Sequence, residues 1–118
     1  MSTPSPRRAA VDAALAEAQR CQAAGDAAAA FAALERAHVL GQRDFAAHWT
    51  VHWCMLRLAV ALRDGREVRG QLLRLALTPL GHLTGRLPAG NTGRSKVSAF
   101  APMPIPPELR SLLEEPRR

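Results

Sequence analysis

The sequence predicts an all-α protein built from two antiparallel helical hairpins, with an extended proline-rich C-terminal segment packed across them. Three observations support this fold class. Aromatic residues make up only 4% of the 118-residue chain and tyrosine is absent, which disfavours a β-sandwich or barrel. Alanine, leucine and arginine, which favour helices, are abundant, and apolar residues recur at helical spacing. Finally, Gly25 and Gly65 each divide a pair of such helical segments.

The first hairpin is predicted to follow a disordered tail at residues 1–6. Its first helix spans about residues 7–24 and ends at Gly25, a residue that suits the end of a helix. Asp26 is a favourable N-cap for the second helix, which is expected to end at Gly41. A turn this short favours an antiparallel pair.

The second hairpin is predicted to begin with a helix at about residues 44–63, where Asp44 is the N-cap. A turn at residues 64–65 separates it from a fourth helix at about residues 66–77. Pro79 and Gly81 are expected to end the helical part, because proline breaks the helical hydrogen-bond pattern.

A helical domain at residues 7–81 is therefore expected, followed by a different kind of segment at residues 82–118. Glycines and Asn91 predict a loop in which the glycines supply positive φ, a conformation that asparagine tolerates. An extended stretch carrying prolines 102, 104, 106 and 107 follows, and Pro107 is expected to open a short helix at about 108–115. Apolar residues recur along this segment, so it is expected to pack back onto the hairpins; they are Phe100, Met103, Ile105, Leu109 and Leu112.

The spacing of the two hairpins resembles that of tetratricopeptide repeats. Gly25, Ala30, Leu34 and Ala37 stand where that repeat has its turn glycine and its small, large and small residues. Its tryptophan, leucine and tyrosine have no counterpart here, so the resemblance concerns hairpin geometry. Two units are also fewer than a solenoid usually needs.

Two longer stretches carry a second resemblance. They are LERAHVLGQRDFAAHWTVHWCML at residues 34–56 and GNTGRSKVSAFAPMPIPPEL at residues 90–109. Together they resemble a small family of bacterial proteins known only as a domain of unknown function. This resemblance implies a bacterial single-domain protein, and it implies no activity, substrate or catalytic residue.

Charge and hydropathy limit the classes of partner. The net charge is +6, and residues 57–96, with eight basic and two acidic residues, account for all of it. A one-sided basic surface would attract an acidic partner.

The first eight residues lack the apolar core of a signal peptide, and the apolar run at 51–62 is too short to span a membrane. We therefore expect a cytoplasmic protein with no membrane association and with reduced thiols at Cys21 and Cys54.

The histidines are the main candidates for chemistry. His48 and His52 are four residues apart and share one helix face, within an apolar arc. His38 ends the preceding helix, so antiparallel packing would bring it close to them. Three imidazoles, with Glu35 or Met55 as further ligands, would hold one copper, zinc or nickel ion. The other interpretation is that they are core residues bonded to backbone carbonyls and to one another.

An enzyme is not expected. The zinc-protease motif needs a glutamate directly after its first histidine, and Trp49 follows His48 instead. No nucleophile or substrate pocket is evident to complete a catalytic set.

The remaining candidates concern partner binding. Trp49 and Trp53 form a stripe about a quarter turn from the histidines, and they are predicted to pack in the core or to bind a partner together with Arg66 and Arg69. The favoured function is a non-enzymatic protein-binding or adaptor module without a cofactor, acting on a protein partner or on itself. Transition-metal binding through the histidines is the first alternative. The second is weak nucleic-acid or anion binding by an arginine-rich face at 63–74, and nucleic acid is the less favoured ligand because stacking aromatics are lacking.

Overall fold

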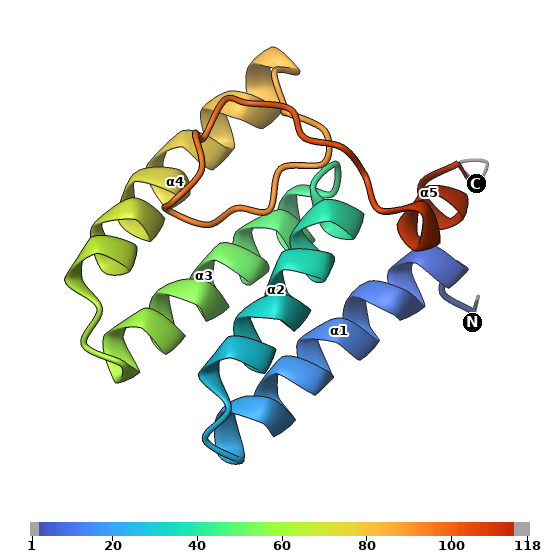
Figure 1. Cartoon of the computed structure of the whole chain (residues 1–118). Helices are drawn as coiled ribbons and strands as arrows, with labels where there is room; N and C mark the ends of the chain where they lie inside the picture. The colour runs from blue at the N-terminus through green and yellow to red at the C-terminus, as the bar shows by residue number, and fades with distance from the viewer. Residues whose placement is uncertain (1–2, 115–118) are drawn as a thin grey trace.

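The part of the chain that the structure describes contains five helices (Figure 1). They are α1 (Pro6–Ala23), α2 (Ala27–Gly41), α3 (Phe45–Ala61), α4 (Gly65–Thr84) and α5 (Pro107–Leu113). The computed structural model describes residues 3–114, and this range contains no strand. The all-α prediction is therefore confirmed. The likeness to tetratricopeptide repeats stays a prediction.

Side-chain caps begin four of the helices, as the sequence predicts for two of them. Asp26 and Asp44 accept backbone N–H groups at the starts of α2 and α3, and Asp64 does the same for α4. Ser5 caps α1 by accepting the N–H of Arg8 at 3.1 Å, and Pro6 is already helical. Because a serine cap and an N-terminal proline both favour a helix start, α1 begins at Pro6, the last residue of the predicted tail at residues 1–6. The first two residues of that tail lie outside the described range.

The prediction that Pro79 and Gly81 end the fourth helix is wrong. Helix α4 continues through Pro79 to Thr84, and its C-cap residue Gly85 has a left-handed φ of 73°. Proline removes only one backbone N–H, and hydroxyl groups on both sides hold the helical turns: Thr78 donates to the Arg74 carbonyl at 2.6 Å and Thr84 to the Leu80 carbonyl at 2.9 Å. The extra turns place His82 on α4.

Helices α1, α2 and α3 enclose the apolar core. Helix α2 lies between α1 and α3, and α4 packs against the other side of α3 (Figure 1). The main cluster is rich in alanine, which lets the helices approach closely; its residues are Ala14, Ala18, Ala30, Phe31, Ala33, Leu34, Ala37, Val51, Met55 and Leu58. A second cluster joins α5 to α1 and α2; its residues are Val11, Val39, Leu40 and Leu109.

The segment after α4 returns across the helices to reach α5 (Figure 1). Asn91 organises this segment, because its amide donates to the carbonyls of Ser98 and Ala101 at 2.7 Å each. Further along, the Met103 N–H donates to the Ala89 carbonyl at 3.0 Å. The loop glycines adopt positive φ as predicted, but Asn91 does not. Glu115, the predicted end of the last helix, lies outside the described residues, and α5 ends at Leu113.

No helix within residues 3–114 combines the length and the apolar character needed to cross a membrane.

Candidate metal centre

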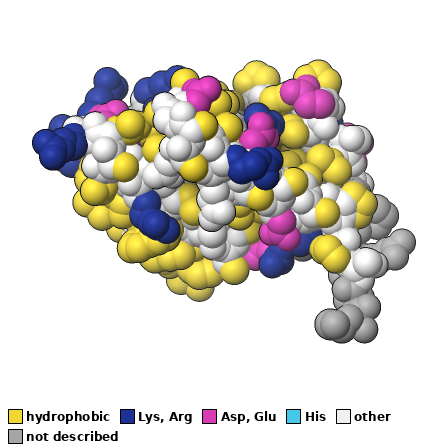
Figure 2. Space-filling view, turned by 90° about the horizontal axis from the view of Figure 1, so that it is seen from below, with side chains coloured by type: hydrophobic (Ala, Val, Ile, Leu, Met, Phe, Trp, Pro, Cys, Tyr) yellow, Lys and Arg dark blue, Asp and Glu magenta, His cyan; other side chains and the backbone are white. Residues whose placement is uncertain are grey.

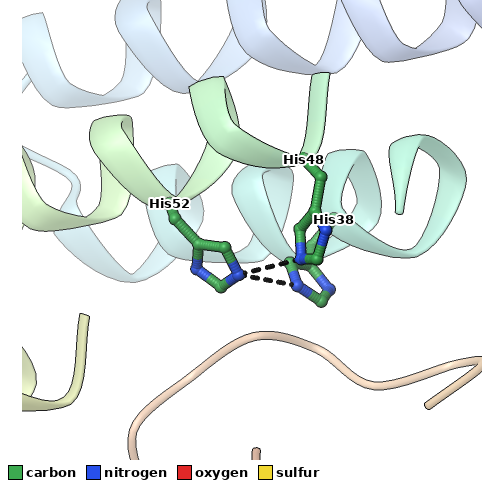
Figure 3. Close-up of side chains that lie close together, drawn as sticks. All are labelled: His38, His48 and His52. Carbon is green, nitrogen blue, oxygen red and sulfur yellow. Dashed lines mark hydrogen bonds between the residues drawn. The ribbon is translucent and has the colours of Figure 1, made fainter. Parts of the chain in front are cut away.

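Three histidines meet in the interior between α2 and α3 (Figure 3). His38 comes from the end of α2, and His48 and His52 come from successive turns of α3. All three side chains are buried. The Nε2 atom of His52 lies 3.1 Å from Nε2 of His38 and 3.1 Å from Nε2 of His48. Ligand nitrogens of the three residues all lie within 4.8 Å of one another.

The opposite nitrogen of each ring is held by a separate partner. His38 Nδ1 donates to the Asn91 carbonyl at 2.6 Å, and His52 Nδ1 donates to Gln71 Oε1 at 2.8 Å. His48 Nδ1 lies 2.9 Å from Nε2 of His82. Each imidazole is thus oriented through Nδ1, and Nε2 is left to face the other two rings.

The orientation of the Gln71 amide is set by its own partners. Its Nε2 donates to Glu67 Oε2 at 2.7 Å and to the Gly93 carbonyl at 2.8 Å. Both of these atoms only accept, so the remaining Oε1 must be the acceptor for His52.

Glu67 is the charged end of this chain of hydrogen bonds. It also accepts from Arg94 Nε at 3.0 Å and from the Ser95 hydroxyl at 2.9 Å. Burial alone would raise the pKa of Glu67, but the hydrogen bonds from Gln71, Arg94 and Ser95 outweigh it and hold the pKa below its ordinary value. A buried carboxylate therefore anchors the glutamine that orients His52.

These partners determine where the protons of the cluster lie. A neutral imidazole carries one N–H, and in His38 and His52 that hydrogen is on Nδ1. Both Nε2 atoms are then lone-pair acceptors, and they face each other at 3.1 Å. His48 can direct a hydrogen either to His82 or to His52, but it cannot supply one to the contact between His38 and His52. In the neutral cluster, the contact between these two nitrogens therefore has no hydrogen to bridge it.

The electrostatic surroundings keep the rings neutral. Burial, with the neighbouring imidazoles adding to it, lowers the pKa of His38 well below its ordinary value. Burial likewise lowers the pKa of His48 to about 3 and that of His52 to about 4. Near pH 7 the three rings are therefore neutral, which is the form in which imidazole binds metals.

Gly93 lets the returning loop cover the cluster. Its φ is +83°, and a Cβ atom at this position would lie 2.6 Å from Cδ2 of the His38 ring. Any larger residue would therefore be strained in its backbone and would displace the imidazole.

A cavity of about 430 Å³ adjoins the cluster and is lined by all three histidines. Helix α4 contributes Arg74 and Leu77 to its wall, and Phe100 comes from the returning segment.

The other proposed ligands and the arginine-rich face lie elsewhere. Glu35 does not join the histidines and lies 4.0 Å from Arg94, and Met55 packs in the apolar core. The sequence places Arg74 on an exposed basic face, but it is buried and donates to the carbonyls of Gly70 and Val97. It lies on the inner side of α4, whereas Arg66 and Arg69 of the same helix are exposed.

The expectation that the tryptophans pack in the core is wrong. Trp49 is 38% exposed and Trp53 is 49% exposed. The histidine face of α3 turns inward instead, which leaves the tryptophan stripe on the outer side of the helix.

Sequence reasoning missed the residues that orient the histidines. His82 falls outside the helix that the sequence predicts, so it is not recognised as a neighbour of His48. Gln71 is overlooked because nothing local distinguishes it from a surface residue, although it lies on α4 one turn after Glu67. The signal that could have found Gln71 is the recurrence of polar residues at helical spacing along one face of α4, at Glu67, Gln71, Arg74 and Thr78.

The fold and the cluster together define a small all-helical protein with a buried centre of three histidines. The chain belongs to the family described as "Protein of unknown function (DUF3703)", which matches residues 5–113. The resemblance to a family of unknown function is thus confirmed. No curated protein and no solved structure matches the chain.

Proposed function

We propose that this protein binds one transition-metal ion through the Nε2 atoms of His38, His48 and His52. The observation that carries the proposal is the facing pair of lone pairs on His38 and His52, which no hydrogen of the neutral cluster can bridge. A metal ion accepts these lone pairs together with that of His48.

The arrangement around each ring supports a metal in particular. Histidine ligands characteristically donate their second N–H to a carbonyl, a carboxylate or water, which sets the tautomer and the ring orientation. Asn91 and Gln71 provide such acceptors for His38 and His52. For His48, His82 Nε2 can take the same role.

The distances require only a modest rearrangement. Ligand bonds of about 2.0–2.1 Å place nitrogens about 3.4 Å apart around a tetrahedral ion. Two of the Nε2 separations are 3.1 Å, and ring rotation has to bring His38 and His48 to a similar separation. Neutral imidazoles suit zinc, copper and nickel, so the three ions are the candidates.

A shared proton is the competing way to satisfy the same contact. It would create an imidazolium in the interior, and burial already lowers the pKa values of His38 and His52. A metal ion instead spreads its charge over three nitrogens, which compensates for the lost hydration far better than one hydrogen bond does.

The test is metal uptake by the protein purified without a histidine tag. We expect one zinc, copper or nickel ion per chain for the wild type and for Thr78→Val, which changes a buried cavity residue that is not a ligand. His52→Leu should bind none while remaining helical by circular dichroism. A folded wild type that takes up none of these ions, or a His52→Leu variant that binds as tightly as the wild type, would contradict the proposal.

A measurement on the wild type alone checks the tautomers. Long-range ¹H–¹⁵N spectra distinguish the protonated from the unprotonated ring nitrogens. In the metal-free protein, His38 and His52 should carry hydrogen on Nδ1, and addition of metal should shift Nε2. Hydrogen on Nε2 of both rings would remove the basis of the proposal.

Binding of a protein partner, or self-association, is a second proposal. Phe45 is exposed next to Trp49, with ring centroids 6.1 Å apart, and Trp53 follows one turn later. Tryptophan is favoured at the centres of interfaces. Sedimentation of the wild type and of a Trp49→Ser/Trp53→Ser variant tests self-association, and a wild type that is monomeric at all concentrations contradicts that form of it.

The surface in Figure 2 is consistent with an apolar contact. Hydrophobic side chains gather along one edge of that view, and Lys and Arg side chains occur as separate groups among them.

Weak anion or nucleic-acid binding through Arg66 and Arg69 stays a proposal with less support, because Arg74 does not share their exposed face.

A further inference from the structure

We propose that the cavity beside the histidines binds a small organic carboxylate with an apolar body, and that its carboxylate completes the coordination of the metal. This inference rests on the proposed metal-binding function. It adds the class of ligand that the bound ion would receive.

The first argument is the number of protein ligands. Within residues 3–114, no other histidine, cysteine, aspartate or glutamate joins the group formed by His38, His48 and His52. A four-coordinate ion with three protein ligands keeps one position for an external group. Because all three histidines line the cavity, that group would come from the cavity, whose volume of about 430 Å³ suits a small organic molecule.

The second argument is charge. Arg74 and Arg86 line the cavity, and no aspartate or glutamate among residues 3–114 does. Arg74 is only 7% exposed. Its terminal nitrogens donate to neutral backbone carbonyls, and its Nε has no hydrogen-bond partner within the described part of the chain. A divalent ion at the histidines would increase the positive potential, so the favourable occupant carries negative charge.

The third argument is the apolar part of the wall. Leu77, Leu80 and Leu87 line the cavity together with Phe100, and the side chains of Leu80 and Phe100 are largely exposed. A bare inorganic anion would leave this apolar surface in contact with water. An apolar chain or ring attached to the anionic group would cover it, and each buried methylene contributes about 0.8 kcal/mol.

A carboxylate is the anionic group that best fits these partners. Its oxygens bind zinc at about 2.0–2.2 Å and accept hydrogen bonds from arginine. The bulky side chains of the wall would then contact the body of the ligand, away from the metal.

The test uses the full chain loaded with Co²⁺, whose visible absorption reports the number and type of its ligands. The probes are 4-phenylbutanoate, acetate and inorganic phosphate. We expect 4-phenylbutanoate to change the spectrum and to bind at least about tenfold more tightly than acetate or phosphate. Equal binding of the three anions, or an unchanged spectrum, would overturn the inference.

A matched pair of variants locates the binding. Leu80 lines the cavity and is 55% exposed, whereas Leu72 lies on the same helix, is 53% exposed and does not line it. Leu80→Asp should weaken 4-phenylbutanoate binding at least about tenfold, and Leu72→Asp should leave it unchanged. Equal effects of the two substitutions would place the ligand elsewhere and overturn the inference.

The two proposals fail in different ways. A wild type that binds none of zinc, copper, nickel and Co²⁺ contradicts the metal-binding proposal itself. A wild type that binds one ion per chain but whose spectrum ignores 4-phenylbutanoate contradicts only the carboxylate ligand.

Discussion

The two sides of α3 are buried by different means. On one side, α3 packs against α1 and α2 through alanines and aliphatic side chains, which make an apolar core. On the other side, the C-terminal end of α2, α3, α4 and the returning loop bury polar and charged groups; they are His38, Gln42, His48, His52, Glu67, Gln71, Arg74, Thr78 and Asn91. Burial of the second kind requires a hydrogen-bond partner for each polar group.

The two regions differ in how closely they specify geometry. Apolar packing depends on volume and tolerates exchanges of similar size. Hydrogen-bonded groups depend on direction, and a buried group without its partner costs about 1–3 kcal/mol. In the polar region, the chain Glu67–Gln71–His52 sets the position of one proton at its end. A fixed proton position of this kind suits a ligand site. As a way to fill a core, burying these polar groups would cost more free energy than apolar packing does.

The largest expected difference between the regions is their response to acid. The pKa of His48 is lowered to about 3 and that of His52 to about 4, from 6.5 in the unfolded chain. Below pH 6.5 the unfolded chain takes up protons that the folded protein does not, so the free energy of unfolding falls by about 1.4 kcal/mol per pH unit for each residue. The loss begins near pH 6.5 and continues to about pH 4 for His52 and to about pH 3 for His48. At pH 5 it amounts to about 2 kcal/mol for each residue.

Urea unfolding of the metal-free protein at pH 7.5, 6.5 and 5 measures this loss. His52→Leu should reduce the dependence on pH by about one proton, because one of the depressed groups is gone. Equal stability of the wild type at pH 7.5 and pH 5 would show that the histidines are not held neutral.

The apolar region should respond to loss of volume and not to metal. Leu58 is buried on α3 within the main cluster. Leu58→Ala should lower the free energy of unfolding by about 3 kcal/mol, because it removes buried surface and leaves a cavity. Urea unfolding measures the loss, and metal titration of the folded fraction should still give one ion per chain. A large change in metal stoichiometry would show that the two regions are not independent.

The same contrast explains what could be predicted from the sequence. Helix class, the caps at Asp26 and Asp44 and the shared face of His48 and His52 depend on neighbours along the chain, so local periodicity predicts them. The partners of the histidines depend on residues far apart in sequence. Asn91 is 53 positions from His38, and its role in the structure is to orient a loop over the cluster.

Pro79 shows how one incorrect local expectation can hide a residue that neighbours the site, in this case His82. Proline usually ends a helix, and that rule places His82 in a loop. The helix continues, and His82 reaches His48 from α4. The exposure of Trp49 and Trp53 has a related cause: periodicity defines faces of a helix but does not say which face meets the neighbouring helices.

Glu67→Gln tests whether the buried carboxylate supports the metal centre. The substitution removes the charge that Arg94, Ser95 and Gln71 share. We expect a loss of about 2 kcal/mol in the free energy of unfolding and weaker metal binding, because Gln71 no longer has a fixed orientation. Urea unfolding and zinc titration measure the two effects. Glu17→Gln is the control, since Glu17 forms an ion pair with Arg36 on the surface and should change stability by less than about 1 kcal/mol.

The smallest expected effect concerns His82, which touches His48 but does not join the three converging nitrogens. In the proposed metal-bound state its Nε2 would accept from His48 Nδ1, so we expect His82 to act as a positioning residue. His82 is partly exposed, and in His82→Ala water can replace much of this hydrogen bond. Zinc affinity should therefore fall by about tenfold, or about 1.4 kcal/mol. In His82→Gln the side-chain oxygen supplies an acceptor, and most of the affinity should return. Competition titration with a coloured zinc indicator measures the wild type and both variants. If His82→Gln and His82→Ala lose affinity equally, His82 supports the fold around His48 through packing against Phe45 rather than through its hydrogen bond.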